Sequence, residues 1–196
     1  MFIVIEGIDG CGKTRVIEEL KKRLEEKGNK VFLTKEPFDN RIKELIKSII
    51  KEEHPKNKYF GLFLACLFAA DRYLHQIEIE DKLNQNFIII SDRYYYSSFS
   101  YQSNYENFDL EWLKNLHKYI RKPDIVFILD VPVKIALERL KERSEKNSYE
   151  TEDFLEKVRK KYLELPKILK DEKIYIIDNS GKIEDTVNKI LSIISI

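Results

Sequence analysis

Hydrophobic and polar positions along this chain follow two alternating patterns. Short apolar runs rich in β-branched and aromatic residues predict strands at Phe2–Glu6, Lys30–Thr34, Phe87–Ser91, Ile125–Asp130 and Lys173–Asp178. Helical spacing of apolar residues predicts helices at Lys13–Lys27, Arg41–Glu52, Lys58–Leu83, Leu110–Ile120, Val133–Arg143, Glu152–Leu169 and Glu184–Ile194. Such alternation predicts an α/β fold, with helices on both faces of a parallel sheet. Ligands bind such a sheet beyond the carboxyl ends of its strands.

Composition narrows this picture to a single domain, residues 1–196, without repeats or linkers. The 35 Lys and Arg residues nearly balance the 34 Asp and Glu residues, so no net field favours nucleic acid or a membrane surface. No apolar stretch is long enough to span a membrane. Cys11 and Cys66 fit neither a disulfide framework nor a zinc site. We therefore expect a soluble protein of the reducing cytoplasm.

A phosphate-binding loop is the first candidate for chemistry. The pattern Gly7-x-x-x-x-Gly12-Lys13-Thr14 lies between the first predicted strand and the first predicted helix. In such a loop, backbone N–H groups and the helix N-terminus surround a phosphate chain, the lysine neutralises the outer phosphates, and the threonine ligates Mg²⁺. These roles fall to Lys13 and Thr14, and the loop positions are Gly7, Ile8, Asp9, Gly10, Cys11 and Gly12.

Asp9 is unusual in a loop that binds anions. A carboxylate there repels phosphate, so Asp9 either faces away from the phosphates or hydrogen-bonds another part of a substrate.

A second candidate follows the third predicted strand, where Asp92 and Arg93 stand at the strand tip. Asp92 can hold Mg²⁺ through water, and Arg93 can fork onto two phosphate oxygens. Tyr95 to Tyr105 is rich in aromatic residues, but Arg93 is the only basic residue between Asp92 and Tyr105, which argues against a groove for single-stranded nucleic acid. Core packing with one small pocket is the better interpretation of this segment.

Two further segments suggest binding roles. The helix from Tyr59 to Ala70 is apolar nearly all round, which indicates that the sheet covers one face and another subunit or a ligand covers the other. A homodimer through this helix is our hypothesis. On the same helix Phe68 and Arg72 share one face and can address one object. The basic segment at about residues 139–150, with Arg139 and Arg143 on one helical face, is either a lid over a nucleotide or a solvated helix end.

These motifs together resemble the thymidylate kinases. The resemblance rests on Glu6–Thr14, Phe68–Arg72, Asp92–Gln102 and Asp124–Pro132, and their order spans nearly the whole chain. It implies transfer of the ATP γ-phosphoryl group to dTMP with Mg²⁺. It also implies the three-layer P-loop kinase fold, with a five-stranded parallel sheet, in a homodimer.

The resemblance also implies residue roles. Asp9 would accept a hydrogen bond from the 3'-hydroxyl, Phe68 would stack on thymine and Arg72 would hydrogen-bond the base. Arg93 would hold the dTMP phosphate and Tyr101 would crowd C2'. Ser98 and Gln102 resemble positions along the thymine edge, and Glu36 resembles the family's acid after the second strand.

The chain departs from the family pattern at three places. The segment after Glu36 reads Pro-Phe-Asp, so the second phosphate-binding basic residue is Arg41 or Lys43, and Lys43 is favoured. Gly10 stands where one branch of the family has a loop arginine, which moves the catalytic arginine to the lid. Arg143 is the candidate there, and Arg139 would flank adenine.

Two rival functions share some of these motifs. A deoxynucleoside kinase acts on a neutral 5'-hydroxyl and needs a base, which Glu36 could supply, although Asp9 argues against that family. A GTP-dependent switch would need Asn-Lys-x-Asp, whereas the chain has Asn57-Lys58-Tyr59-Phe60.

Overall fold

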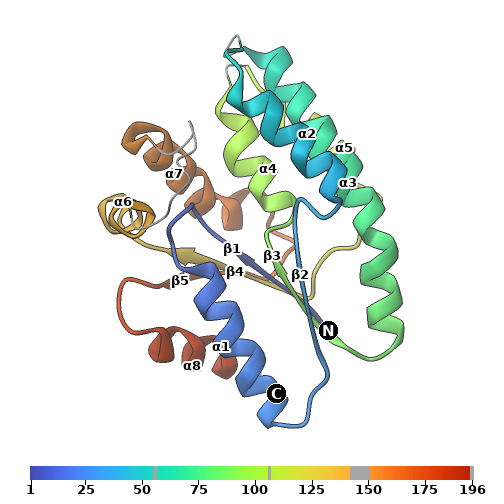
Figure 1. The fold of residues 1–196 in the computed structure, drawn as a ribbon, viewed down its shortest axis with the longest axis vertical. Helices are drawn as coiled ribbons and strands as arrows, with labels where there is room; N and C mark the ends of the chain where they lie inside the picture. Colours follow the sequence, from blue (N-terminus) through green and yellow to red (C-terminus); the bar gives the residue numbers. More distant parts are fainter. Residues whose placement is uncertain (55–56, 106, 142–150, 195–196) are drawn as a thin grey trace.

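The computed structural model describes residues 1–54, 57–105, 107–141 and 151–194. Its core is a five-stranded sheet in the order β2-β3-β1-β4-β5. All four strand pairs are parallel, which confirms the predicted α/β fold (Figure 1). The strands are β1 (Phe2–Glu6), β2 (Val31–Lys35), β3 (Ile88–Asp92), β4 (Ile125–Asp130) and β5 (Ile174–Asp178).

Helices cover both faces of this sheet (Figure 1). They are α1 (Lys13–Glu26), α2 (Asn40–Lys51), α3 (Lys58–Asn84), α4 (Tyr95–Tyr101), α5 (Leu110–Leu116), α6 (Val133–Lys141), α7 (Glu152–Ile168) and α8 (Ile183–Ile194), with a short 3₁₀ helix η1 (Gln102–Asn104). Helices α1 and α8 pack together on one side, and α4 and α7 pack together on the other. The result is the three-layer arrangement that the alternating pattern predicts.

The central strand β1 brings the phosphate-binding loop into the middle of the sheet. All five of its residues are buried, because β3 and β4 flank it and helices cover both faces. Its carboxyl end at Glu6 leads directly into Gly7. Within the described residues, no helix combines the length and apolar character needed to cross a membrane.

Two of the predicted helical assignments need correction. The helix predicted to run from Leu110 to Ile120 ends at Leu116, because His117 adopts a non-helical backbone and its N–H turns back to the Lys114 carbonyl. Helix α4 was missed, since its sequence of Tyr, Ser and Phe has little helix propensity of its own. The predicted helix up to Arg143 is observed as far as Lys141, and residues 142–150 lie outside the described part.

Candidate active site

The loop between β1 and α1 is held closely against its neighbours. Gly10 has φ of 81°, and a Cβ there would lie 2.3 Å from the Ala136 carbonyl oxygen. Gly12 has φ of 97°, and its Cβ would lie 2.8 Å from Asn179 Nδ2. Only glycine combines a positive φ with this lack of space. The backbone is therefore fixed in the turn that a phosphate-binding loop needs.

Two side chains far along the chain hold this loop from outside. Asn179, just after β5, donates from Nδ2 to the Cys11 carbonyl at 2.7 Å. Arg139 on α6 donates to the same carbonyl at 3.2 Å and to the Asn179 carbonyl at 3.2 Å. Arg139 therefore lies where the loop meets the end of β5. Asn179 was missed by the sequence reasoning, although a polar residue directly after the last strand was the available signal.

Lys13 and Thr14 begin helix α1 and face different surroundings. The buried Lys13 Nζ donates to the carbonyls of Gly7 at 3.1 Å and Ile8 at 3.2 Å, so the ammonium group lies inside the loop. Thr14 is exposed and lines a cavity of about 410 Å³. Asp92, Lys43 and Thr34 line the same cavity. The loop threonine and the strand-tip acid thus share one open space.

The surroundings of Asp92 fit a magnesium ion held through water. Its Oδ2 lies 3.3 Å from Lys35 Nζ, whereas its buried Oδ1 has no hydrogen-bond partner among the described residues. Such an orphaned carboxylate oxygen, on a residue that lines the same cavity as a threonine, is suited to a hard cation. No cluster of three or more His, Cys, Asp or Glu side chains with metal-binding geometry occurs in the described part. A magnesium ion here would take its remaining ligands from phosphate and water.

Asp9, Arg93 and Tyr101 form one ionic cluster beside the loop. Arg93 Nη2 donates to Asp9 Oδ1 at 2.6 Å, and the Tyr101 hydroxyl donates to Asp9 Oδ2 at 3.0 Å. The guanidinium also lies 5.2 Å from the centre of the Tyr101 ring. Burial alone would raise the pKa of Asp9, but the charges of Arg93 and Lys13 lower that pKa to about 2. Asp9 is therefore ionised at neutral pH and points to Arg93.

Glu6 is a buried acid next to the loop whose contacts the sequence reasoning missed. This fully buried carboxylate accepts hydrogen bonds from the backbone N–H groups of Tyr94 at 2.7 Å and Ser97 at 3.2 Å. It thereby satisfies the start of α4, whose own N-cap residue, Tyr94, makes no side-chain cap. Glu6 also accepts from the Tyr162 hydroxyl at 2.8 Å. Burial raises the pKa of Glu6.

Arg72 on α3 and Glu36, just after β2, form a second ionic cluster. Arg72 is 1% exposed, and its Nε and Nη2 lie 2.7 and 2.6 Å from Glu36 Oε2. His75 Nδ1 lies 3.2 Å from Glu36 Oε1, and Arg72 Nη1 lies 3.5 Å from Ser98 Oγ. Both Glu36 oxygens are engaged by side chains, which argues against Glu36 as a free base for a 5'-hydroxyl.

Other predicted acceptor-site residues lie near these clusters along the chain. Phe68 is half-buried on α3, one helical turn before Arg72. Gln102 is buried at the start of η1, immediately after Tyr101. Arg41 is exposed and forms an ion pair with Asp39 at 2.8 Å, whereas Lys43 lines the cavity that contains Thr14 and Asp92. The geometry favours Lys43 over Arg41. Arg143 and the rest of the predicted lid beyond Lys141 lie outside the described residues.

A phosphate-binding loop on a five-stranded parallel sheet, with an acid and an arginine at the neighbouring strand tip, defines a P-loop kinase. A family model described as thymidylate kinase matches residues 5–190. The chain belongs to the thymidylate kinase family, and its activity is the ATP-dependent phosphorylation of dTMP to dTDP.

Relatives of similar length support this assignment. A probable thymidylate kinase of Thermococcus kodakarensis is 39% identical over 99% of this chain and 97% of its own length. Probable thymidylate kinases of Sulfurisphaera tokodaii and Methanocaldococcus jannaschii are 37% and 38% identical. These alignments cover 98% and 97% of this chain, and 95% and 94% of the relatives. The rival deoxynucleoside kinase and switch interpretations are thereby set aside.

Proposed function

We propose that the Asp9, Arg93 and Tyr101 cluster binds the sugar and phosphate of dTMP, while Gly7 to Thr14 hold the triphosphate of ATP. The observation that carries this proposal is the 2.6 Å ion pair between Arg93 and the loop acid Asp9. This ion pair brings the arginine that would bind the acceptor into contact with the loop that would bind the donor. Asp9 would accept from the 3'-hydroxyl, and the adjacent Tyr101 ring would exclude a 2'-hydroxyl.

The thymine base would lie beside α3 and α4. Phe68 would stack on the ring, Arg72 would donate to it, and Ser98 and Gln102 would line its edge. Glu36 would hold Arg72 through the 2.7 and 2.6 Å contacts. An arginine anchored by a buried carboxylate loses little side-chain freedom when it binds a ligand, which favours selective recognition.

Phosphoryl transfer then requires alignment and charge neutralisation. The dTMP phosphate is ionised at neutral pH, so one of its oxygens bonds to the γ-phosphorus without a general base as the bond to ADP breaks. Lys13 would exchange its bonds to the Gly7 and Ile8 carbonyls for phosphate oxygens. Arg93 and Lys43 would hold the acceptor phosphate, with Arg143 as the lid catalyst and Arg139 beside adenine.

Thr14 and Asp92 would hold magnesium, Asp92 through water. When bound, the ion supplies positive charge that offsets the β- and γ-phosphates. Asp92 Oδ1, which has no hydrogen-bond partner in the described part of the chain, supports this assignment.

We also propose a homodimer through α3. Large apolar side chains remain exposed along one side of this helix: Tyr59 (69%), Phe63 (45%), Tyr73 (37%), Leu74 (37%) and Ile77 (70%). Together with the exposed Cys66 and Ala70, they form the α3 stripe. With Leu74 left aside, the steps between neighbouring stripe residues alternate between four and three, the spacing of a helix–helix seam. A second copy of the chain would cover it.

The free thiols of Cys11 and Cys66 support a reducing compartment, the cytoplasm.

A coupled ADP-release assay over dTMP, dUMP, dGMP, dCMP, UMP and thymidine tests the acceptor assignment. We expect turnover with dTMP and none with thymidine, which lacks the ionised phosphate. Lys43→Ala and Arg41→Ala form a matched pair, because both remove one basic residue from α2. Lys43→Ala should raise KM for dTMP and Arg41→Ala should not; the reverse result would reassign the phosphate contact.

A further inference from the structure

His117 links the base-binding arginine to a second cavity. This residue follows α5, is 6% exposed and lies 2.7 Å from Arg72 through its Nε2. Its other ring nitrogen, Nδ1, lies 2.8 Å from the Leu113 carbonyl oxygen. A carbonyl only accepts, so Nδ1 must carry the proton and Nε2 must accept from Arg72. The two contacts together fix one neutral tautomer.

We propose that His117 is a positioning residue that orients Arg72 toward the acceptor base. This inference rests on the proposed base-binding role of Arg72. Arginine has five N–H donors. Glu36 accepts from the Nε N–H and from one N–H of Nη2, and His117 accepts from one N–H of Nη1. One N–H then remains on each terminal nitrogen, and that of Nη1 makes a long hydrogen bond of 3.5 Å to Ser98 Oγ, which a base oxygen would replace. Held at both ends, the guanidinium presents a fixed pair of donors.

The fixed N–H donors of Arg72 select bases that present a hydrogen-bond acceptor and reject bases that present a donor. A thymine carbonyl oxygen can accept from Arg72, whereas an amino group at that position would meet donor with donor. His117 contributes only while it is neutral, because a protonated ring would present a second cation to Arg72. Burial and the neighbouring Arg72 charge lower the pKa of His117 to about 3. His117 therefore stays neutral throughout the physiological pH range.

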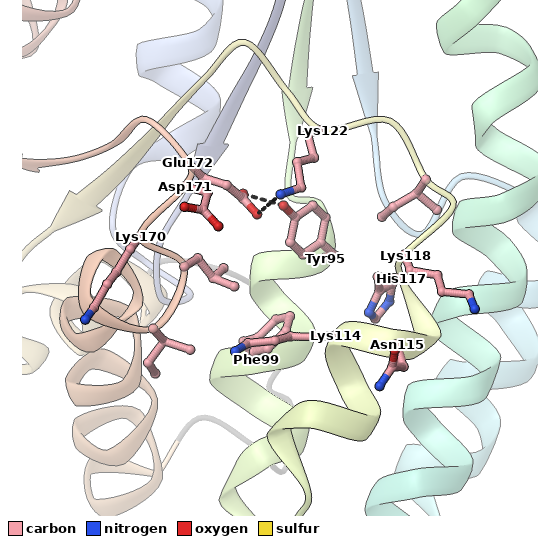
Figure 2. Close-up of a pocket in the computed structure, with 13 residues that line it drawn as sticks. Tyr95, Phe99, Lys114, Asn115, His117, Lys118, Lys122, Lys170, Asp171 and Glu172 are labelled. Atoms are coloured by element: carbon pink, nitrogen blue, oxygen red, sulfur yellow. Dashed lines mark hydrogen bonds and ion pairs between the residues drawn. The ribbon is translucent and has the colours of Figure 1, made fainter.

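His117 also lines a cavity of about 400 Å³ (Figure 2). The cavity lies between α4, α5 and the segment that follows α7, and Tyr95 and Phe99 line it beside His117. The Tyr95 ring stacks on the imidazole with 5.7 Å between centroids. A small molecule that enters this cavity can therefore reach the position of the imidazole from outside the acceptor site.

Two substitutions of His117 by side chains of similar length test its hydrogen bond with Arg72. His117→Gln keeps an acceptor oxygen near the position of Nε2, whereas His117→Met has similar volume and no strong acceptor. We expect His117→Met to raise KM for dTMP by about 10- to 100-fold, the effect of one hydrogen bond to a charged group. KM for ATP should change less than twofold, and His117→Gln should stay within threefold of the wild type for both substrates. Equal KM values for the two variants, whether normal or raised, would overturn the proposal.

Chemical rescue gives a second readout that a purely structural role would not produce. His117→Ala joins the space of the lost ring to the cavity, so added imidazole should restore dTMP affinity at least fivefold. The rescue should strengthen as pH rises and imidazole loses its proton, since only the neutral ring accepts from Arg72. Rescue by imidazolium, or none in a variant that melts like the wild type, would contradict the proposal. A normal KM for dTMP in Arg72→Ala would instead refute the proposed role of Arg72, so the two failures are distinguishable.

Discussion

At the residue scale, Arg93 joins the phosphate-binding loop to α4. It donates to Asp9 at 2.6 Å, Ser97 at 3.1 Å and Tyr162 at 3.2 Å. We expect Arg93→Ala to lower kcat by a factor on the order of 10³, because a forked guanidinium at a phosphoryl-transfer site stabilises developing charge. Arg93 has φ of 75°, but alanine carries the same backbone penalty, so the fold should persist.

Steady-state kinetics and a thermal melt of Arg93→Ala measure the two effects separately. Arg121→Ala is the matched control, because Arg121 is also ion-paired, with Glu80 at 3.2 Å, but lies outside the clusters described above. Near-normal turnover in Arg93→Ala would remove its proposed role.

Asp9 leads to a prediction about pH. Its folded-state pKa of about 2 lies below the ordinary value of 3.8, so the ionised form stabilises the fold. This stabilisation is complete above about pH 4 and is lost as pH falls from there to about 2. We expect Asp9→Asn to lower the free energy of unfolding by about 1 to 2 kcal/mol at neutral pH. This figure is reduced from the full pKa shift because the side chain is 32% exposed.

Urea unfolding of Asp9→Asn between pH 2 and 7 should accordingly give a flatter stability profile than the wild type. The substitution should also weaken the binding of dTMP more than the binding of ATP. An equal loss for both substrates would point to a damaged phosphate-binding loop.

At the element scale, a buried side chain of β1 positions α4. Glu6→Ala would leave the N–H groups of Tyr94 and Ser97 without their acceptor. Each unsatisfied buried donor costs about 1 to 3 kcal/mol, so we expect a loss of about 2 to 4 kcal/mol. Because α4 carries Ser98 and Tyr101, KM for dTMP should rise as well.

Denaturant unfolding and dTMP kinetics test this role, with Glu6→Gln as the partner variant that retains an acceptor. The exposed Glu26, at the end of α1, gives the control Glu26→Ala. A stable Glu6→Ala variant with normal dTMP affinity would show that α4 is positioned by other contacts.

The elements show which features a single sequence can predict. All five strands were placed within one residue at each end, because each is a short run rich in β-branched and aromatic residues. The three central strands, β3, β1 and β4, are also buried on both faces, which needs an unbroken apolar run. Helix α4 was missed because its start depends on Glu6, which lies 88 residues before Tyr94 in the chain. No local pattern records such a contact, and the same is true of the hydrogen bond from Asn179 to the loop.

At the scale of the whole molecule, the sheet order explains why the predicted site residues gather. Strand β1 lies between β3 and β4, so Gly7 follows the central strand, with Asp92 and Asp130 at the ends of its neighbours. The rule that ligands bind beyond the carboxyl ends of parallel strands was therefore enough to select this edge. It could not supply the side-chain pairing: the contact between Asp9 and Arg93, and the separate cluster of Arg72 and Glu36, emerge only from the packing.

The α3 stripe leads us to predict that two chains assemble into a dimer. Phe63 is 45% exposed and Ile77 is 70% exposed, and a dimer would bury both. We expect the double variant Phe63→Glu and Ile77→Glu to weaken self-association at least 100-fold, since an unpaired buried carboxylate costs several kcal/mol. Tyr119→Glu is the control, because Tyr119 is 77% exposed but lies outside α3. Sedimentation velocity should show dimers for the wild type and the control, and monomers for the double variant. A monomeric wild type at micromolar concentration would contradict the dimer.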